Sequence, residues 1–95
     1  MLVYTGQLRV SAENAAEFEA TIAEYSSWVM ANEPGTVYYA GHKSSDDPES
    51  YLVIEVYRDE AAFEAHKKTD QMKAALTKVG PLVSGTTVVK RYEGI

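Results

Sequence analysis

The 95-residue chain contains no cysteine, which excludes disulfides, thiolate zinc sites, iron–sulfur clusters and a cysteine nucleophile. Its two histidines, His42 and His66, are too few for a histidine-rich metal site, and no metal-ligand spacing is present. We therefore predict no metal site. Glycine-rich phosphate loops, HExxH motifs and nucleophile elbows are absent too. None of these common enzyme motifs therefore indicates a function.

Basic residues are also scarce, because 9 Lys and Arg stand against 14 Asp and Glu, for a net charge of −5. Nucleic acids and anionic membranes attract basic surfaces, so neither is expected as a partner. No apolar run approaches the roughly 18 residues that span a bilayer. The first residues lack the basic and apolar regions of a signal peptide. We therefore expect a cytoplasmic protein.

The hydrophobic periodicity predicts six regular elements within a single domain, residues 1–95. Strands are expected over residues 2–10, 36–43, 51–58 and 86–93. Helices are expected from Ser11, as the N-cap, to about residue 32, and from 60 to 79 with a restart at residues 69–70. The first helix carries an apolar stripe of Phe18, Ile22, Tyr25 and Val29. The order β-α-β-β-α-β predicts an α+β, ferredoxin-like antiparallel sheet with both helices on one face.

Strands 2–10 and 51–58 carry apolar residues at both odd and even positions, and therefore on both faces of the sheet. The helices cover only one face of the sheet, and the other face of a monomer should be polar. A second copy covering the bare face, in a symmetric homodimer, resolves this conflict. The alternative is an apolar sheet face that stays exposed.

Four segments in order carry a resemblance to a known family. They are Leu8–Glu13, Asn32–Thr36, the strand–helix segment Tyr51–His66, and Val88–Glu93. The set resembles the antibiotic biosynthesis monooxygenase domain, whose members form dimeric α+β barrels. The resemblance implies a pocket between the helices and the sheet of each subunit. Some members oxygenate quinols or polycyclic phenols with O2 and no cofactor, whereas others degrade haem or isomerise small metabolites.

The chain also departs from the family pattern. Tyr57 stands where many relatives carry tryptophan, and Leu76 aligns with the histidine of haem-degrading members. Leucine cannot ligate iron, so haem degradation is not expected. Gln7 corresponds to a strand amide of those relatives. His66 aligns with one of their pocket tryptophans, which suggests that it lines the pocket.

His66 and Glu55 are the leading candidates for chemistry. His66 could act as a general base on a phenolic hydroxyl, or it could be a structural histidine bonded to a carbonyl or to Glu55. A buried Glu55 must be paired or have its pKa raised. It could orient His66 or contact substrate, or it could pair with a cation. The candidate cations are Arg58, Lys90 and Arg91.

The remaining candidates are expected to bind substrate. Gln7 could donate an amide hydrogen bond to a ligand oxygen, although neighbouring groups could equally satisfy it. Trp28, Tyr39 and Tyr57 could stack on an aromatic ligand, although packing also explains such residues. Phe63 and Met72 are expected to face inward from the second helix.

The leading functional hypothesis is a cofactor-independent monooxygenase that oxidises an electron-rich phenol or quinol with O2. One alternative is a non-catalytic module for ligand binding or dimerisation, and another is an isomerase of small metabolites. A cavity of a few hundred cubic ångströms reached by His66 would favour an enzyme. A space filled by Phe63, Met72 and Trp28 would favour the module.

Overall fold

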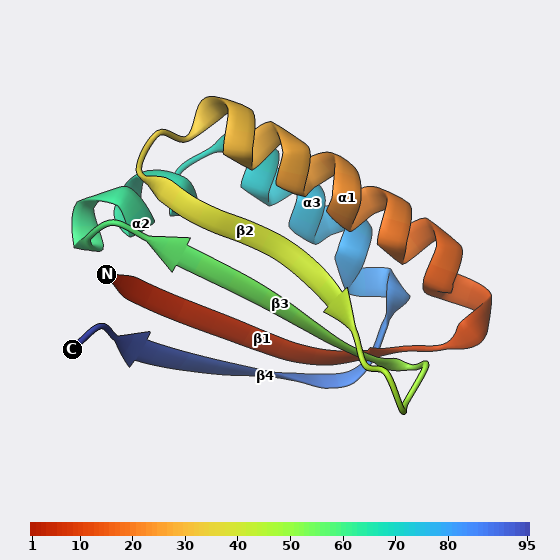
Figure 1. Ribbon diagram of the computed structural model, residues 1–95. Coiled ribbons are helices and arrows are strands. Elements are labelled where there is room, and N and C mark those ends of the chain that lie inside the picture. The colour runs from red at the N-terminus through yellow and green to blue at the C-terminus, as the bar shows by residue number, and fades with distance from the viewer.

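An antiparallel four-stranded sheet carries helices on one face in the computed structural model, which describes all 95 residues (Figure 1). The strands are β1 (Leu2–Val10), β2 (Thr36–Lys43), β3 (Ser50–Tyr57) and β4 (Val83–Glu93), in the spatial order β2-β3-β1-β4. The helices are α1 (Ala15–Asn32), α2 (Glu60–Lys67) and α3 (Asp70–Val79). The predicted α+β, ferredoxin-like fold is confirmed, with the second helix divided in two. No helix has the length and apolar character needed to cross a membrane.

The α1 helix follows the predicted stripe, since Phe18, Ile22, Tyr25 and Val29 are all buried. Its start differs from the prediction. The Ser11 side chain makes no capping hydrogen bond, and a 3-10 turn over Ala12–Asn14 leads into the helix instead. The helix stops where predicted, because the residue before a proline disfavours the helical region. Glu33, which precedes Pro34, is extended.

The break between α2 and α3 comes from two separate caps. The Asp59 carboxylate accepts a hydrogen bond from the Ala62 amide, and the Thr69 hydroxyl accepts one from the Met72 amide. The Thr69 hydroxyl also donates to the His66 carbonyl. Each cap satisfies an amide at the start of a helix. The chain therefore turns directly after His66, which fixes this residue at the end of α2.

The register assigns each strand residue to a face of the sheet. Tyr4 of β1 lies opposite Glu55 of β3, whereas Gln7 lies opposite Leu52. Successive strand side chains point to opposite faces, so Tyr4 and Glu55 face the helices and Gln7 faces away. The pairing of β2 with β3 shifts by one residue between Thr36 and Tyr38, so the alternate residues of β2 exchange faces at that point. The core consists of Leu8, Val10, Phe18, Ile22, Tyr51, Val53 and Leu82.

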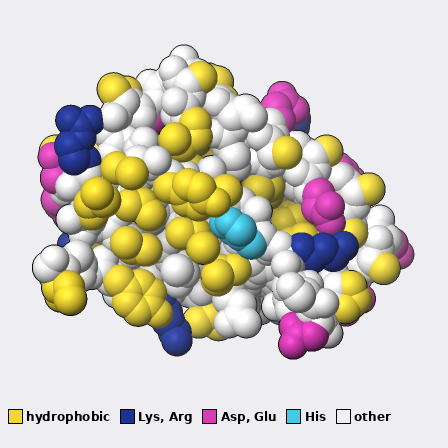
Figure 2. Space-filling model, in the orientation of Figure 1, with side chains coloured by type: hydrophobic (Ala, Val, Ile, Leu, Met, Phe, Trp, Pro, Cys, Tyr) yellow, Lys and Arg dark blue, Asp and Glu magenta, His cyan; other side chains and the backbone are white.

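The face of the sheet turned away from the helices is also apolar, and Figure 2 shows hydrophobic side chains gathered over the strands. We call this surface the outer face. It is formed by the outward parity of β1, β3 and β4. Its apolar members are Val3, Leu52, Ile54, Val56, Val88 and Tyr92. Val88 and Tyr92 are about half exposed, at 48% and 49%.

Candidate active site

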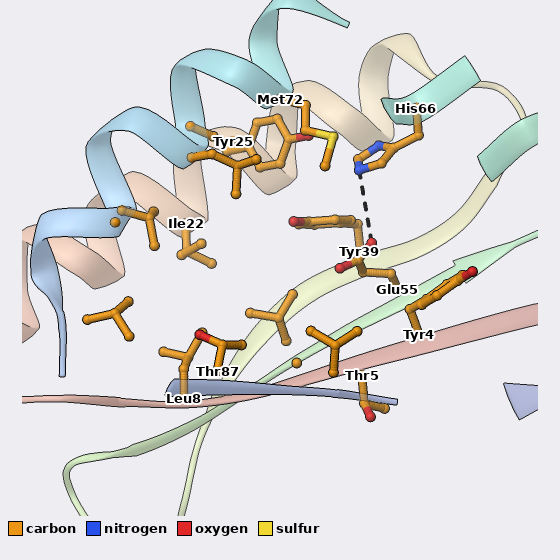
Figure 3. Close-up of a pocket in the computed structure, with 18 of the residues that line it drawn as sticks. Tyr4, Thr5, Leu8, Ile22, Tyr25, Tyr39, Glu55, His66, Met72 and Thr87 are labelled. Carbon is orange, nitrogen blue, oxygen red and sulfur yellow. Dashed lines mark ion pairs between the residues drawn. The ribbon is translucent and has the colours of Figure 1, made fainter. Parts of the chain in front are cut away.

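A cavity of about 490 Å³ lies between the sheet and the helices α1 and α3 (Figure 3). Most of its lining is apolar, with Ile22 and Tyr25 from α1 and Met72 and Leu76 from α3. The edge strand β4 forms one side through small or short side chains, among them Gly85, Thr87 and Val89. A space of this size accommodates a small ligand.

His66 lies at one end of the cavity and is 2% exposed. Its Nδ1 is 2.7 Å from Glu33 Oε1, and its Nε2 is 4.0 Å from Glu55 Oε1. The second of these pairs is drawn in Figure 3. An ionised carboxylate can only accept hydrogen bonds, so the short contact places a proton on Nδ1. In the neutral ring, Nε2 then keeps its lone pair on the Glu55 side.

Two side chains, those of His66 and Thr36, donate hydrogen bonds to Glu33 at the turn that ends α1. Its Oε1 also accepts a hydrogen bond from the Thr36 hydroxyl at 2.9 Å, while Oε2 is buried without a partner. Glu33 is not among the site residues predicted from the sequence, because it lies at the end of the first predicted helix, next to Pro34 and Gly35. A carboxylate placed where a helix turns back into the sheet is the signal that could have identified it.

Glu55 projects from β3 and accepts a hydrogen bond from the Tyr57 hydroxyl at 2.5 Å. Burial raises the pKa of Glu55, although the Tyr57 hydrogen bond and the nearby imidazole of His66 oppose that rise. None of the cations suggested by the sequence pairs with it. Arg91 binds Glu60 instead, at 2.9 Å. Glu55 thus belongs with His66 rather than with a surface ion pair.

Three tyrosine rings surround the imidazole. The ring centroids of Tyr57, Tyr39 and Tyr25 lie 5.2, 5.5 and 6.2 Å from that of His66. Burial is the main cause that raises the pKa of each phenol. All three are therefore neutral at physiological pH and form a low-dielectric collar around the histidine.

The structure brings five of the eight predicted site residues to the cavity: Tyr39, Glu55, Phe63, His66 and Met72. Tyr57 is fully buried and reaches the site only through Glu55. Two placements were wrong. Gln7 is exposed on the outer face, because it has the opposite strand parity from Tyr4. Trp28 lines a separate hollow between α1 and α3, since it lies on the flank of the buried stripe.

Phe63 and Met72 line the cavity rather than fill it, and His66 reaches it. No group of three or more His, Cys, Asp or Glu side chains is arranged to hold a metal ion.

Comparison with known proteins agrees with this architecture. The profile of the family described as antibiotic biosynthesis monooxygenase matches residues 1–78. The chain belongs to the antibiotic biosynthesis monooxygenase family. The structure of a Caulobacter crescentus protein of the same family name is 32% identical in sequence, with a TM-score of 0.94, and the match covers 99% of this chain and 89% of that one.

A more distant solved structure shows the same fold, and one relative is known by sequence. A Nitrosomonas europaea structure is 21% identical, with a TM-score of 0.92 and coverage of 100% of this chain and 99% of its own. An uncharacterized Synechocystis protein is 27% identical over 92 residues. The match covers 97% of this chain but 62% of that protein, so the chain spans less than two thirds of this relative.

Proposed function

We propose that the protein is a cofactor-independent monooxygenase that oxidises an electron-rich phenol or quinol with O2. The observation that carries this proposal is the buried His66, whose Nδ1 is bound to Glu33 and whose Nε2 lies on the Glu55 side of the cavity. A neutral imidazole with a free Nε2 is a general base suited to removing a phenolic proton. The family membership supports oxygenation as the reaction class.

The reaction begins when the substrate lies in the apolar cavity with a hydroxyl at His66. His66 Nε2 takes the hydroxyl proton, and Glu33 stabilises the resulting imidazolium through Nδ1. The phenolate is electron-rich enough to transfer one electron to O2, and the two radicals then combine. For a quinol, one oxygen atom enters a ring C–H bond, and two hydrogens from the hydroxyls leave with the other as water. The substrate supplies all the electrons, so the balance requires no external reductant.

The collar of tyrosines contributes by keeping water away from the reacting hydroxyl. Electrostatic interactions between fixed groups are stronger in such a low-dielectric site than in water. Glu55, whose pKa is raised by burial, lies where it can bind the same hydroxyl as His66.

The test is oxygen uptake with hydroquinones and anthrones in an oxygen electrode. The wild type is expected to consume one O2 per quinol, and added catalase should return no O2, because no hydrogen peroxide forms. His66→Ala should lower the rate about 10²–10⁴-fold, the usual contribution of a general base. His42→Ala is the matched control, since His42 bonds Tyr38 and the Leu52 carbonyl away from the cavity.

Two outcomes would contradict the oxygenase proposal. Absence of protein-dependent oxygen uptake across the panel would favour the non-catalytic module. Product formation without O2 would favour an isomerase that uses the same base.

We also propose that a second copy of the chain covers the outer face. Support comes from its run of apolar side chains, which water would otherwise contact. Exposed apolar patches of this kind on soluble proteins mark interaction sites. Sedimentation equilibrium should give twice the chain mass of 10.5 kDa. Ile54→Asp should give a monomer, whereas Met30→Asp, at an exposed apolar position on α1, should leave the dimer intact. A monomeric wild type would refute this proposal.

A further inference from the structure

Three ionisable side chains lie in a row, with His66 between two carboxylates, and two of the three, His66 and Glu55, line the cavity. Glu33 follows α1, His66 lies in the last turn of α2, and Glu55 belongs to β3. The side chains of Glu33 and His66 are only 10% and 1% exposed, and neither carboxylate forms an ion pair with lysine or arginine. His66 is therefore the only basic group paired with the two acids.

We propose that Glu33 is a positioning residue that makes the end of the cavity at His66 select a ligand hydroxyl over an ether or a carbonyl of the same shape. It does so by fixing the proton on Nδ1 of His66, which leaves Nε2 as a hydrogen-bond acceptor. This inference rests on the proposed function only in placing the substrate hydroxyl at His66.

The carboxylate of Glu33 is itself fixed, because the Thr36 hydroxyl donates to the same Oε1 that faces Nδ1. An imidazole proton occupies the nitrogen that has the better acceptor nearby. Without the Glu33 carboxylate, Nδ1 has no acceptor in the structure, and the proton moves to Nε2. It would then point toward Glu55, 4.0 Å away. The side of the ring that meets the ligand would change from acceptor to donor.

With Glu33 in place, a ligand oxygen beside His66 meets the lone pair of Nε2, whereas the nearby Glu55 Oε1 already accepts a hydrogen bond from the Tyr57 hydroxyl. A hydroxyl can donate its proton to Nε2. A methyl ether has no proton to donate and leaves the buried Nε2 unpaired, which weakens binding. The carbonyl of an oxidised product also has no proton to donate to Nε2. The tautomer therefore favours binding of the hydroxylated substrate and release of the oxidised product.

Binding measured without oxygen tests this selection apart from any chemistry. Wild-type protein should bind 2-naphthol about 10- to 100-fold more tightly than 2-methoxynaphthalene, the range expected for a buried hydrogen bond to a strong acceptor. Glu33→Ala should reduce this preference to within about 3-fold. Glu33→Gln should largely retain it, because the amide oxygen can still accept from Nδ1.

Nitrogen-15 spectra of the histidines provide the readout that a merely structural role would not change. His66 should carry its proton on Nδ1 in the wild type and in Glu33→Gln, and on Nε2 in Glu33→Ala. His42 is the internal control, because its own bonds to Tyr38 and the Leu52 carbonyl do not involve Glu33. Circular dichroism confirms that each variant is folded.

The proposal is overturned if wild-type His66 is protonated on Nε2, whether or not the variants fold. Equal affinity of the wild type for the hydroxyl and methoxy ligands would also overturn it. Selective naphthol binding combined with no oxygen uptake would refute the oxygenase proposal while leaving the role of Glu33 intact. The two failures are therefore distinguishable.

Discussion

Removing the Tyr57 hydroxyl tests how strongly the fold depends on the buried site. Tyr57 is fully buried, and its hydroxyl donates to Glu55 at 2.5 Å. A hydrogen bond to a neutral group contributes about 1 kcal/mol, and one to a charged group about 1.5–3 kcal/mol. Tyr57→Phe should therefore cost about 1 kcal/mol while Glu55 is protonated, and about 2–3 kcal/mol once Glu55 is ionised. For a domain of this size, 2 kcal/mol corresponds to roughly 8–16 °C in Tm.

The ionisation of Glu55 determines how the difference in the free energy of unfolding between wild type and Tyr57→Phe changes with pH. The Tyr57 hydroxyl favours the ionised form of Glu55 and so lowers the pKa that burial raises. In Tyr57→Phe this opposing effect is lost, and the pKa of Glu55 rises further. The gap in the free energy of unfolding between wild type and variant should therefore widen as the pH rises from 5 to 9. Urea unfolding at fixed protein concentration measures this gap.

Tyr51→Phe is the matched control for this experiment. Tyr51 is also buried, and its hydroxyl donates to Glu19 at the same distance of 2.5 Å. The Glu19 side chain, however, is 48% exposed, so water can replace the lost donor. Tyr51→Phe should lower the free energy of unfolding by a smaller amount, and that amount should not change between pH 6 and 9. The Tyr51 hydrogen bond lowers the pKa of Glu19, so Glu19 stays ionised over this range. Two results would refute the proposed role of Glu55. One is an equal decrease in the free energy of unfolding in both variants, and the other is a decrease in Tyr57→Phe that does not change with pH.

Two further predictions concern stability. Because the pKa of Glu55 is raised in the folded protein, protonated Glu55 favours the folded state. This contribution to the free energy of unfolding is fully present below the ordinary pKa of 4.5 and is lost as the pH rises through the folded-state pKa. Glu55→Gln should therefore raise Tm relative to wild type at pH 8 more than at pH 4.5, as measured by scanning calorimetry, and a constant difference would contradict this. At Gly41, an added Cβ would lie 2.7 Å from Ile22 Cγ2. Gly41→Ala should thus lower the free energy of unfolding by about 1–3 kcal/mol, whereas Gly80→Ala, with nothing within 4 Å, should not; similar urea midpoints for the two variants would count against it.

Much of the fold could be predicted from local signals. The stripe on α1, the proline after Glu33 and the Asp59 cap each act over a few residues, and each has the effect on its helix that its residue type favours. The start of α1 was less predictable, because Ser11 has a suitable side chain that makes no capping bond. The extension of β4 back to Val83 depends on its pairing with Val10, which no local pattern reveals.

The site was only partly predictable, because its groups are distant in sequence. His66 was identified from its helix face and from resemblance. Its partner Glu33 precedes it by 33 residues and is brought to it only by the packing of α1 and α2 against the same strand, β2. Gln7 was misplaced because the direction of a strand's parity depends on the whole sheet, and a shift of one residue exchanges the faces.

The edge strand β4 gives the cavity one wall that, beyond Val83, takes no part in the hydrophobic core. Its side chains are largely exposed, and none of the seven core residues belongs to it. Gly85, at a φ of 71°, needs its lack of a side chain, but Thr87 and Val89 have ordinary backbone angles. Substitutions at Thr87 and Val89 can therefore reshape this wall of the cavity while leaving the folded scaffold unchanged. Evolution or a protein engineer can use these two positions to alter the range of accepted molecules independently of His66.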